Sequence, residues 1–314
     1  MKRLTTLLTA GWLALGVSAS ALAVDLNIGY QKSAINLLSL KAQGTLEKKL
    51  QPLGVSVKWY EFQAGPPILE AINAGSLSIG MTGDSPPVFA QAAGADIVYI
   101  GQEPAKPESS AILVAENSPI RKLADLKGKC IAFTKGSSAH FLTVSALAKA
   151  GIAYKDITPV YLSPSEARAA FERGNVDAWT IWDPYYAAAQ HAGHVRVLTT
   201  GKGLSSNNTF YLASRKFAEA NPQVIDTVFK ALTENNKQLS GDTKQIAATL
   251  AGYSGLDAST FEGVLSRHPD YSVSYLKPQV LAEQQKVADA FYGLGLIPKA
   301  IQVKDIAWKP AGAR

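Results

Sequence analysis

The sequence predicts an α/β protein made of two doubly wound lobes that face each other across a cleft, and three observations support this prediction. Strand-like and helix-like segments alternate through most of the chain, as expected when helices cover both faces of a sheet. Residues 71–94 and 170–193 align without a gap at an offset of 99 residues, which suits two similar lobes rather than a solenoid. Two polar stretches, 103–110 and 201–208, have the Pro, Gly and Ser content of linkers.

The first lobe is expected to begin with strands and helices in alternation. The pattern predicts a strand at 26–30, a helix ending near 50, a strand at 55–62, a helix at 65–73, a strand at 77–81, a helix from 86 and a strand at 97–101. Pro66 lies in the first turn of its helix, where a missing N–H does no harm. The βα alternation predicts a parallel sheet.

The chain then leaves the first lobe, builds a second and returns. The pattern predicts a strand at 112–115, a loop and short helix at 118–126, strands at 129–134 and 178–181 around a helix at 141–150, a strand at 210–214 and mostly helices beyond 221. We therefore assign residues 24–110 and 209–314 to lobe I and residues 111–208 to lobe II. Two such crossings form a hinge about which the lobes can close.

The first 23 residues carry the pattern of a secretory signal peptide. Lys2 and Arg3 precede an apolar stretch at 7–17, and Ala21 and Ala23 form an A-x-A cleavage site. The apolar stretch is shorter than the ~20 residues that a membrane-spanning helix needs. We expect residues 1–23 to be removed by cleavage after Ala23 and the mature chain to reside in the periplasm.

Composition argues against several classes of function. The net charge of +6 is spread along the chain, so nucleic acid is not expected as a partner. The single Cys130 excludes an internal disulfide and is expected in a strand. His191 and His194 lack a third ligand, so no metal or other cofactor is expected. No P-loop, G-x-S-x-G or H-E-x-x-H motif is present, and the chain is not expected to be an enzyme.

A glycine and two serines between a strand and a helix have the arrangement of an anion-binding loop. Gly136 allows close backbone approach, Ser137 and Ser138 add hydroxyl groups, and the helix N-terminus supplies free N–H groups and a positive dipole. His140 is a further candidate at this edge. The alternative is that a serine side chain only caps the helix.

The repeated segment places an Asp at the same position of each lobe, Asp84 and Asp183. Ligands of open α/β sheets bind outside the carboxyl ends of the strands, so both are candidate ligand residues. The alternative is that each caps the helix that follows it. Trp182 corresponds to Gly83 in the first lobe. We interpret Trp182 as a wall of the cleft and Gly83 as a floor that leaves room for a ligand, the alternative being a tryptophan packed in the core.

Two further places in the first lobe lie at the same edge of the sheet. Gln31 and Lys32 follow the first strand, and Lys32 either pairs with an anion or contacts only solvent. Gly65 and Pro66 begin another helix at this edge. All four are included in the candidate ligand site.

Five segments of the chain carry a family resemblance: GYQK at 29–32, TGDSPPVFAQAAGAD at 82–96, LVAENSPI at 113–120, KGSSAH at 135–140 and GNVDAWTIWDPYY at 174–186. They resemble the aliphatic sulfonate-binding proteins that feed ABC importers. The likeness spans nearly the whole mature chain and is weakest after residue 221. It implies a type II periplasmic-binding fold and a receptor that delivers its ligand to a membrane permease with a cytoplasmic ATPase. Related proteins bind taurine, nitrate and thiamine precursors, so the resemblance leaves the ligand partly open.

The residues favour an alkanesulfonate as the ligand. A sulfonate stays anionic at physiological pH and can be held by neutral donors and helix dipoles, while Trp182, Phe141 and Tyr185 could flank an alkyl chain. Nitrate has no such chain, and taurine would need Asp183 or Asp84 as an acceptor for its ammonium. The open alternatives are a receptor for taurine, nitrate or another small anion, and an enzyme on the same fold. The receptor is expected to be a monomer.

Overall fold

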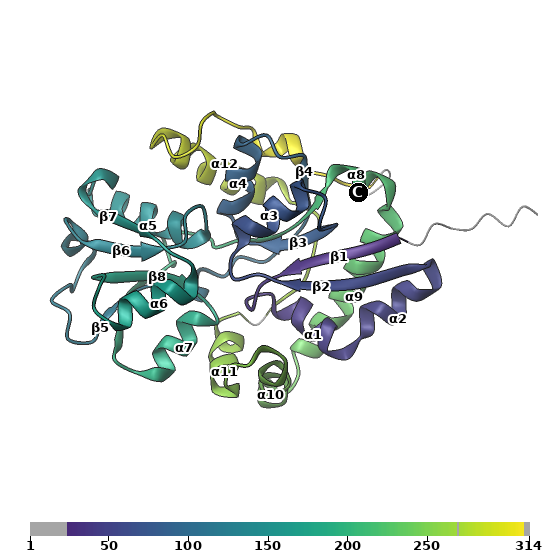
Figure 1. Ribbon diagram of the computed structural model, residues 1–314, viewed down its shortest axis with the longest axis horizontal. Coiled ribbons are helices and arrows are strands. Elements are labelled where there is room, and N and C mark those ends of the chain that lie inside the picture. The colour runs from purple at the N-terminus through teal and green to yellow at the C-terminus, as the bar shows by residue number, and fades with distance from the viewer. Residues whose placement is uncertain (1–23, 269, 311–314) are drawn as a thin grey trace, which may run out of the picture.

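The computed structural model describes residues 24–268 and 270–310, which form two α/β lobes side by side (Figure 1). The strands divide into two five-stranded sheets, one in each lobe. The expected signal peptide lies outside the described residues. Within the described part of the chain, no helix is long and apolar enough to cross a membrane.

The first sheet is mixed rather than parallel. Its strands, in spatial order, are β2 (Val55–Glu61), β1 (Val24–Tyr30), β3 (Ile79–Thr82), β10 (Thr209–Ser214) and β4 (Ile97–Glu103). β1, β2 and β3 are parallel, but β10 runs antiparallel to both β3 and β4. The prediction of a parallel sheet is therefore wrong, because the strand that returns from the second lobe enters the sheet from the opposite end.

The second sheet has the same design. Its strands, in spatial order, are β7 (Thr158–Tyr161), β6 (Cys130–Phe133), β8 (Ala178–Trp182), β5 (Ser110–Ala115) and β9 (Val195–Thr200). β6 is parallel to β7 and β8, whereas β5 is antiparallel to β8 and β9. The reversed strand is again the one that directly follows a crossing between the lobes.

Helices cover both faces of each sheet (Figure 1). Lobe I holds α1 (Ile35–Gln43), α2 (Thr45–Leu50), α3 (Gly65–Asn73), α4 (Ser85–Ala92), α8 (Arg215–Ala220), α9 (Pro222–Leu239) and α12 (Pro278–Gly293). Lobe II holds α5 (Ser138–Lys149), α6 (Pro164–Glu172) and α7 (Tyr185–Ala192). α10 (Thr243–Ser254) and α11 (Ala258–Arg267) follow α9, and short 3-10 turns lie at Gln51–Leu53, Pro107–Ser109, Leu123–Leu126, Tyr154–Asp156 and Val303–Ile306.

β10 illustrates how the first sheet is buried on both faces. Tyr211 and Ala213 join the core beneath α1 and α9, whereas Phe210 and Leu212 join the core beneath α3 and α12. Successive side chains of a strand point to opposite faces, so a strand covered on both sides must be apolar throughout. Lobe II has a separate core around β6 and β8.

The repeated segment forms the same unit in both lobes. It covers the end of α3, β3 and α4 in lobe I, and the end of α6, β8 and α7 in lobe II. The shared Gly75 and Gly174 adopt φ of 77° and 72°, a region that favours glycine. Several predicted boundaries differ by a few residues; the first helix is divided at Gly44, and α5 begins at Ser138 rather than at residue 141.

The two crossings between the lobes are bonded to each other. One connects β4 to β5 and the other connects β9 to β10. The Lys106 N–H donates to the Ser206 carbonyl at 3.0 Å, and Asn207 Nδ2 donates to the Lys106 carbonyl at 3.1 Å. The hinge is therefore a paired structure built largely from backbone contacts.

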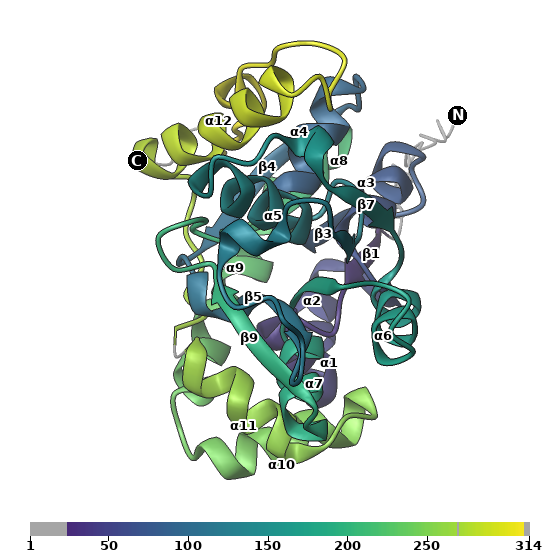
Figure 2. The ribbon, with the colours of Figure 1, turned by 90° about the vertical axis from the view of Figure 1, so that its left-hand side faces the viewer.

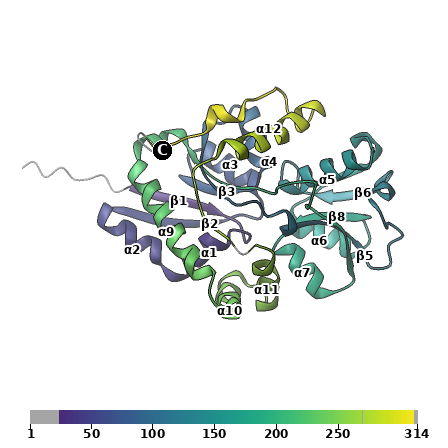
Figure 3. The ribbon, with the colours of Figure 1, turned by 180° about the vertical axis from the view of Figure 1, so that it is seen from behind.

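The C-terminal helices contact both lobes. α10 packs against α1 of lobe I, and α11 packs against α7 of lobe II. Figure 3 shows α9 running along the back of lobe I, with α10 and α11 following it toward α7. α12 lies at the other end of the molecule, where it packs against α4 (Figure 2). The C-terminal segment thus helps to close the space between the lobes.

Candidate functional site

A cavity lies between the two lobes, beside the crossings. Its empty space is about 560 Å³, including the part that opens to solvent. Both lobes, both crossings and the C-terminal segment contribute to its lining. The predicted site residues that line it are Gln31, Gly65, Gly83, Ser137, Ser138, Trp182 and Asp183.

The remaining predicted residues do not line the cavity; they are Lys32, Pro66, Asp84, Gly136 and His140. The Lys32 ammonium donates to the Ser254 carbonyl and lies 3.8 Å from Glu61 Oε1. The Lys32 side chain therefore links the end of β1 to the end of α10 and does not face the cavity. Gly136 adopts a φ of 71°, and a Cβ atom there would lie 3.3 Å from the ring of Phe89.

His140 is fully buried beside the cavity rather than in its wall. Its Nδ1 accepts a hydrogen bond from the Gly136 N–H at 3.2 Å, and its Nε2 lies 2.9 Å from Tyr154 Oη. The ring stacks on Phe133 at a centroid distance of 4.9 Å. Burial lowers the pKa of His140 to about 3, with the charge of Lys135 acting in the same direction. His140 therefore shapes the loop before α5 as a neutral side chain.

The N-terminus of α5 borders the cavity at Ser137 and Ser138. Ser137 occupies the N-cap position, but its hydroxyl donates to the Thr134 carbonyl at 2.7 Å and makes no cap bond to the helix. The interpretation as a serine side-chain cap is therefore wrong. The N–H groups in the first turn of a helix have no carbonyl one turn earlier, so that of Ser138, a residue of the cavity lining, is available to an anion.

Gly83 and Ser138 bring the two lobes into contact. A Cβ atom at Gly83 would lie 2.0 Å from Ser138 Oγ, a distance that no real contact permits. The same Oγ accepts a hydrogen bond from the Asp84 N–H at 3.2 Å. Glycine is thus needed here for the close approach of α5, in addition to lining the cavity.

Asp84 is buried behind the cavity wall, with 2% of its surface exposed. Its Oδ1 accepts from the Ser85 hydroxyl at 2.9 Å, and its Oδ2 from the Ser205 hydroxyl at 3.4 Å. It makes no side-chain cap bond to α4, so the capping interpretation is wrong for this residue. Burial raises the pKa of Asp84 above its ordinary value, an effect that these hydroxyls oppose.

Trp182, the last residue of β8, lies both in the core of lobe II and in the cavity wall. It is 8% exposed and meets Tyr185 edge to face at a centroid distance of 6.3 Å. Neither Tyr185 nor Phe141 lines the cavity; Phe141 instead contacts Phe291 of α12 at 5.9 Å. The apolar wall is completed by Met81 and other residues of lobe I and α11.

Asp183 forms an ion pair across the lobes with Arg267, at the end of α11. Arg267 Nη1 lies 2.8 Å from Oδ1 and 2.9 Å from Oδ2, and Oδ1 also accepts from the Ala187 N–H at 3.0 Å. Burial raises the pKa of Asp183 to about 6, against the opposing effect of Arg267. Its carboxylate thus bonds both to the first turn of α7 and to the other lobe.

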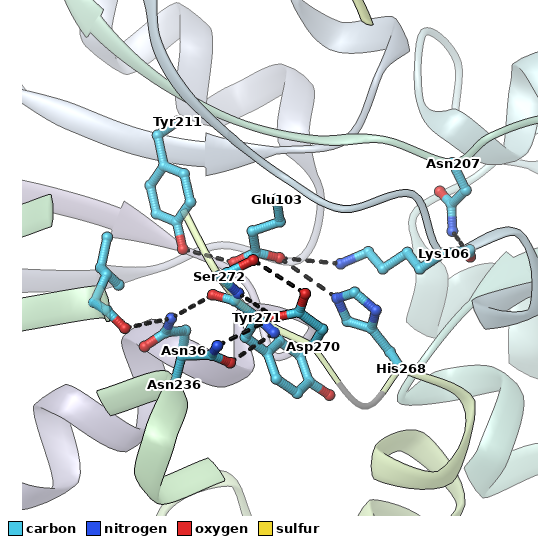
Figure 4. Close-up of polar contacts among 11 residues, drawn as sticks. Asn36, Glu103, Lys106, Asn207, Tyr211, Asn236, His268, Asp270, Tyr271 and Ser272 are labelled. Atoms are coloured by element: carbon cyan, nitrogen blue, oxygen red, sulfur yellow. Dashed lines mark hydrogen bonds and ion pairs between the residues drawn. The ribbon is translucent and has the colours of Figure 1, made fainter. Parts of the chain in front are cut away.

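Sequence reasoning missed a polar cluster at the hinge side of the cavity (Figure 4). Lys106, His268 and Tyr271 line the cavity, and Glu103 lies behind them. Lys106 Nζ and His268 Nε2 are 3.7 and 3.8 Å from Glu103 Oε2, and the Tyr211 hydroxyl donates to Glu103 Oε1 at 2.7 Å. The available signal was the position of Lys106 inside a predicted linker, because a hinge between lobes borders their cleft.

Aromatic contacts hold the lobes together on the side of the cavity opposite Arg267. Phe291 of α12 lies 5.0 Å from His140 and 4.8 Å from Phe89 of α4, as measured between ring centroids. The lobes therefore touch on both sides of the cavity. Residues 24–268 and 270–310 contain no cluster of His, Cys, Asp and Glu suited to a metal ion.

Comparison with known proteins identifies similar chains. A family model described as NMT1/THI5 like matches residues 51–240. A protein of Escherichia coli K12 named for binding aliphatic sulfonates is 46% identical over 313 residues, which cover 99% of this chain and 98% of that protein.

Two solved structures of sulfonate-binding proteins are also similar to this chain. The periplasmic aliphatic sulphonate binding protein SsuA from Escherichia coli superposes with a TM-score of 0.84 at 46% identity, covering 92% of this chain and 94% of that chain. The alkanesulfonate-binding protein SsuA from Xanthomonas axonopodis pv. citri, bound to MOPS, superposes with a TM-score of 0.87 at 45% identity, covering 91% and 98%.

Proposed function

This chain belongs to the NMT1/THI5-like family, and we propose that it is the solute-binding receptor of an ABC importer that captures aliphatic sulfonates between its lobes. The two-lobed α/β fold predicted from the sequence is confirmed by its likeness to the two SsuA structures. The observation that carries the proposal is the cavity itself, which is closed by both lobes and bordered by a helix N-terminus.

The site suits an anion that never titrates. The first-turn N–H groups of α5 and the amide of Gln31 are neutral donors, and helix dipoles favour negative charge at this end. The Ser137 hydroxyl is engaged with a carbonyl, so we assign the sulfonate contacts chiefly to backbone N–H groups. Trp182 and Met81 offer apolar surface to a carbon tail.

An alkanesulfonate fits this cavity better than taurine or nitrate. Asp183, one predicted acceptor for an ammonium, is already bonded to Arg267, and Asp84, the other, does not line the cavity. Nitrate would leave the apolar wall unused. Binding without catalysis is proposed because the similar proteins named above are binding proteins.

The proposed working cycle is a closure of lobe I (24–110 and 209–314) on lobe II (111–208) about the two crossings. The closed receptor, a periplasmic monomer, would deliver its ligand to a membrane permease driven by a cytoplasmic ATPase. The paired crossings and the contacts on both sides of the cavity support this motion.

Calorimetry on the mature protein tests the proposal. Methane-, propane- and hexanesulfonate should bind to one site per chain, more tightly than sulfate or nitrate. Small-angle scattering should show a smaller radius of gyration at saturation with ligand. Absence of binding to any alkanesulfonate, or tighter binding of nitrate, would contradict the proposed function.

A further inference from the structure

The hinge side of the cavity presents donor groups that no described residue satisfies. The Lys106 ammonium makes no hydrogen bond to a described residue; its nearest carboxylate oxygen, Glu103 Oε2, is 3.7 Å away. His268 Nε2 and Tyr271 Oη are buried and also lack a hydrogen-bond partner among the described residues. All three residues line the same cavity as Ser137 and Ser138 at the start of α5. Glu103 Oε2 also lacks a hydrogen bond to any described residue and is the oxygen nearest to Lys106 and His268, at 3.7 and 3.8 Å. Buried polar groups are nearly always paired, and this one oxygen, beyond hydrogen-bond distance, cannot pair an ammonium and the Tyr271 hydroxyl as well, so the cavity lacks a further acceptor at this place.

The charge of this cluster makes it selective for acceptors. Glu103 is 1% exposed, lies behind the lining and is held by the Tyr211 hydroxyl. Its carboxylate balances the charge of Lys106, while burial lowers the pKa of His268 and favours the neutral ring. The cluster therefore faces the cavity with the Lys106 ammonium, the Tyr271 hydroxyl and a neutral imidazole, not with its carboxylate.

The contacts that Lys106 makes within the hinge do not require its ammonium. Lys106 holds the hinge through its backbone N–H and carbonyl, which bond to Ser206 and Asn207. Any residue with a similar stem could make those two contacts. The side chain is 11% exposed, and burying a charge without full pairing is costly. That cost is offset if a ligand supplies the acceptor.

We propose that Lys106, assisted by His268 and Tyr271, determines specificity by binding an acceptor group, a carboxylate or a hydroxyl, on the carbon tail of the bound sulfonate. The inference rests on the proposed function, in which backbone N–H groups of α5 hold the sulfonate. α5 belongs to lobe II, whereas Lys106 lies in a crossing and the other two residues follow α11. The preferred ligands are thus sulfonates with a polar group at the far end, and an ammonium at that end is disfavoured by Lys106.

A matched series of ligands tests this specificity by calorimetry. The series has the form X–CH2–CH2–SO3⁻, where X is methyl (propanesulfonate), hydroxyl (isethionate), carboxylate (3-sulfopropionate) or ammonium (taurine), and is repeated with one more methylene. At one or both chain lengths, the carboxylate and hydroxyl ligands should bind at least about tenfold more tightly than the ammonium ligand. The affinity of the methyl ligand should lie between those of the ammonium ligand and the other two.

The variant Lys106→Met isolates the ammonium. It should weaken the carboxylate ligand at least about tenfold, change propanesulfonate less than threefold and strengthen taurine. If this variant unfolds because Glu103 is left unpaired, the double variant Glu103→Gln/Lys106→Met should show the same selective loss. Lys202→Met is the matched control, since Lys202 is an exposed lysine of the second crossing and should leave the ranking unchanged.

The outcomes separate the inference from the proposed function. Binding of no sulfonate by the unmodified protein overturns both. Equal affinity for the four X groups, with alkanesulfonates still bound, overturns only the inference. An equal loss for all four ligands in Lys106→Met shows that Lys106 holds the sulfonate group itself and also overturns it.

Discussion

Arg267 and Asp183 form an ion pair that joins the two lobes directly at the edge of the cavity. The guanidinium also lies 4.1 Å from the centroid of the Tyr186 ring, so that a cation–π contact supports its orientation. Asp183 is 4% exposed and lines the cavity, which couples closure of the lobes to the ligand site. The position of Arg267 is set in turn by α11, a helix that comes much later in the sequence than Asp183.

Loss of this ion pair should weaken ligand binding. Arg267→Gln leaves a buried carboxylate without its cation, which typically costs about 3–5 kcal/mol, and the partial exposure of Arg267 places the expected loss at the lower end. We expect at least about a tenfold loss of affinity and a larger radius of gyration at equal ligand saturation. The control is Arg215→Gln, which breaks a surface pair with Asp96 inside lobe I and should change affinity little. Unchanged affinity in Arg267→Gln would show that closure does not depend on the pair.

Gly83→Ala should prevent full closure, because its Cβ would meet Ser138 Oγ at 2.0 Å. We expect weaker ligand binding with little change in melting temperature, since the lobes can separate to relieve the clash. Ser138→Ala in the same chain removes Oγ and leaves Ser138 Cβ at 3.3 Å, so the double variant should recover part of the affinity. Gly252→Ala, where the added Cβ meets nothing within 4 Å, is the control. A double variant as weak as Gly83→Ala would mean that the serine is not the obstacle.

Trp182 should determine how the receptor responds to chain length. Longer alkyl chains gain about 25 cal/mol for each Å² of apolar surface that they bury against its indole. Trp182→Leu should therefore weaken hexanesulfonate more than methanesulfonate, as measured by the two dissociation constants. Trp179→Leu is the comparison, because Trp179 is 1% exposed and does not line the cavity; it should lower the melting temperature without changing the ratio. Equal losses for both ligands in Trp182→Leu would indicate a packing role.

His140 should make the protein sensitive to acid. Its pKa is about 3 when folded and ordinarily 6.5, so the unfolded chain takes up a proton first as the pH falls. Neutral His140 therefore stabilises the fold fully above about pH 6.5, and that contribution decreases toward pH 3. The slope is about 1.4 kcal/mol per pH unit, or roughly 2–3 kcal/mol between pH 6.5 and 4.5.

Urea unfolding of His140→Phe at pH 7 and pH 4.5 measures this contribution. The variant should be less stable at pH 7, because Gly136 and Tyr154 lose their partner, and the difference from the unmodified protein should shrink by about 2–3 kcal/mol at pH 4.5. His191→Phe, at an exposed residue of α7, is the matched control. A constant difference between the two pH values for His140→Phe would contradict the burial argument.

Local patterns were sufficient for the elements and for much of the cavity wall. The alternation of apolar residues and the glycines with positive φ depend on near neighbours, so the repeat at 71–94 and 170–193 predicted two similar units. The carboxyl ends of parallel strands meet at one edge, which is why Gln31, Gly83 and Trp182 could be placed together before any contact was known.

The remaining features depend on contacts between distant parts of the chain. Arg267 meets Asp183 across 84 residues, and Ser138 meets the Asp84 N–H across 54 residues. The direction of β10 and the position of Lys106 follow from how the chain crosses between the lobes. A residue pattern records local periodicity and burial, but it does not record which distant partner a side chain meets. The amino-acid sequence alone therefore predicted the class of protein and part of the cavity lining. The ion pair that joins the lobes and the polar cluster at the hinge depend on the tertiary structure, because their residues are far apart in the sequence.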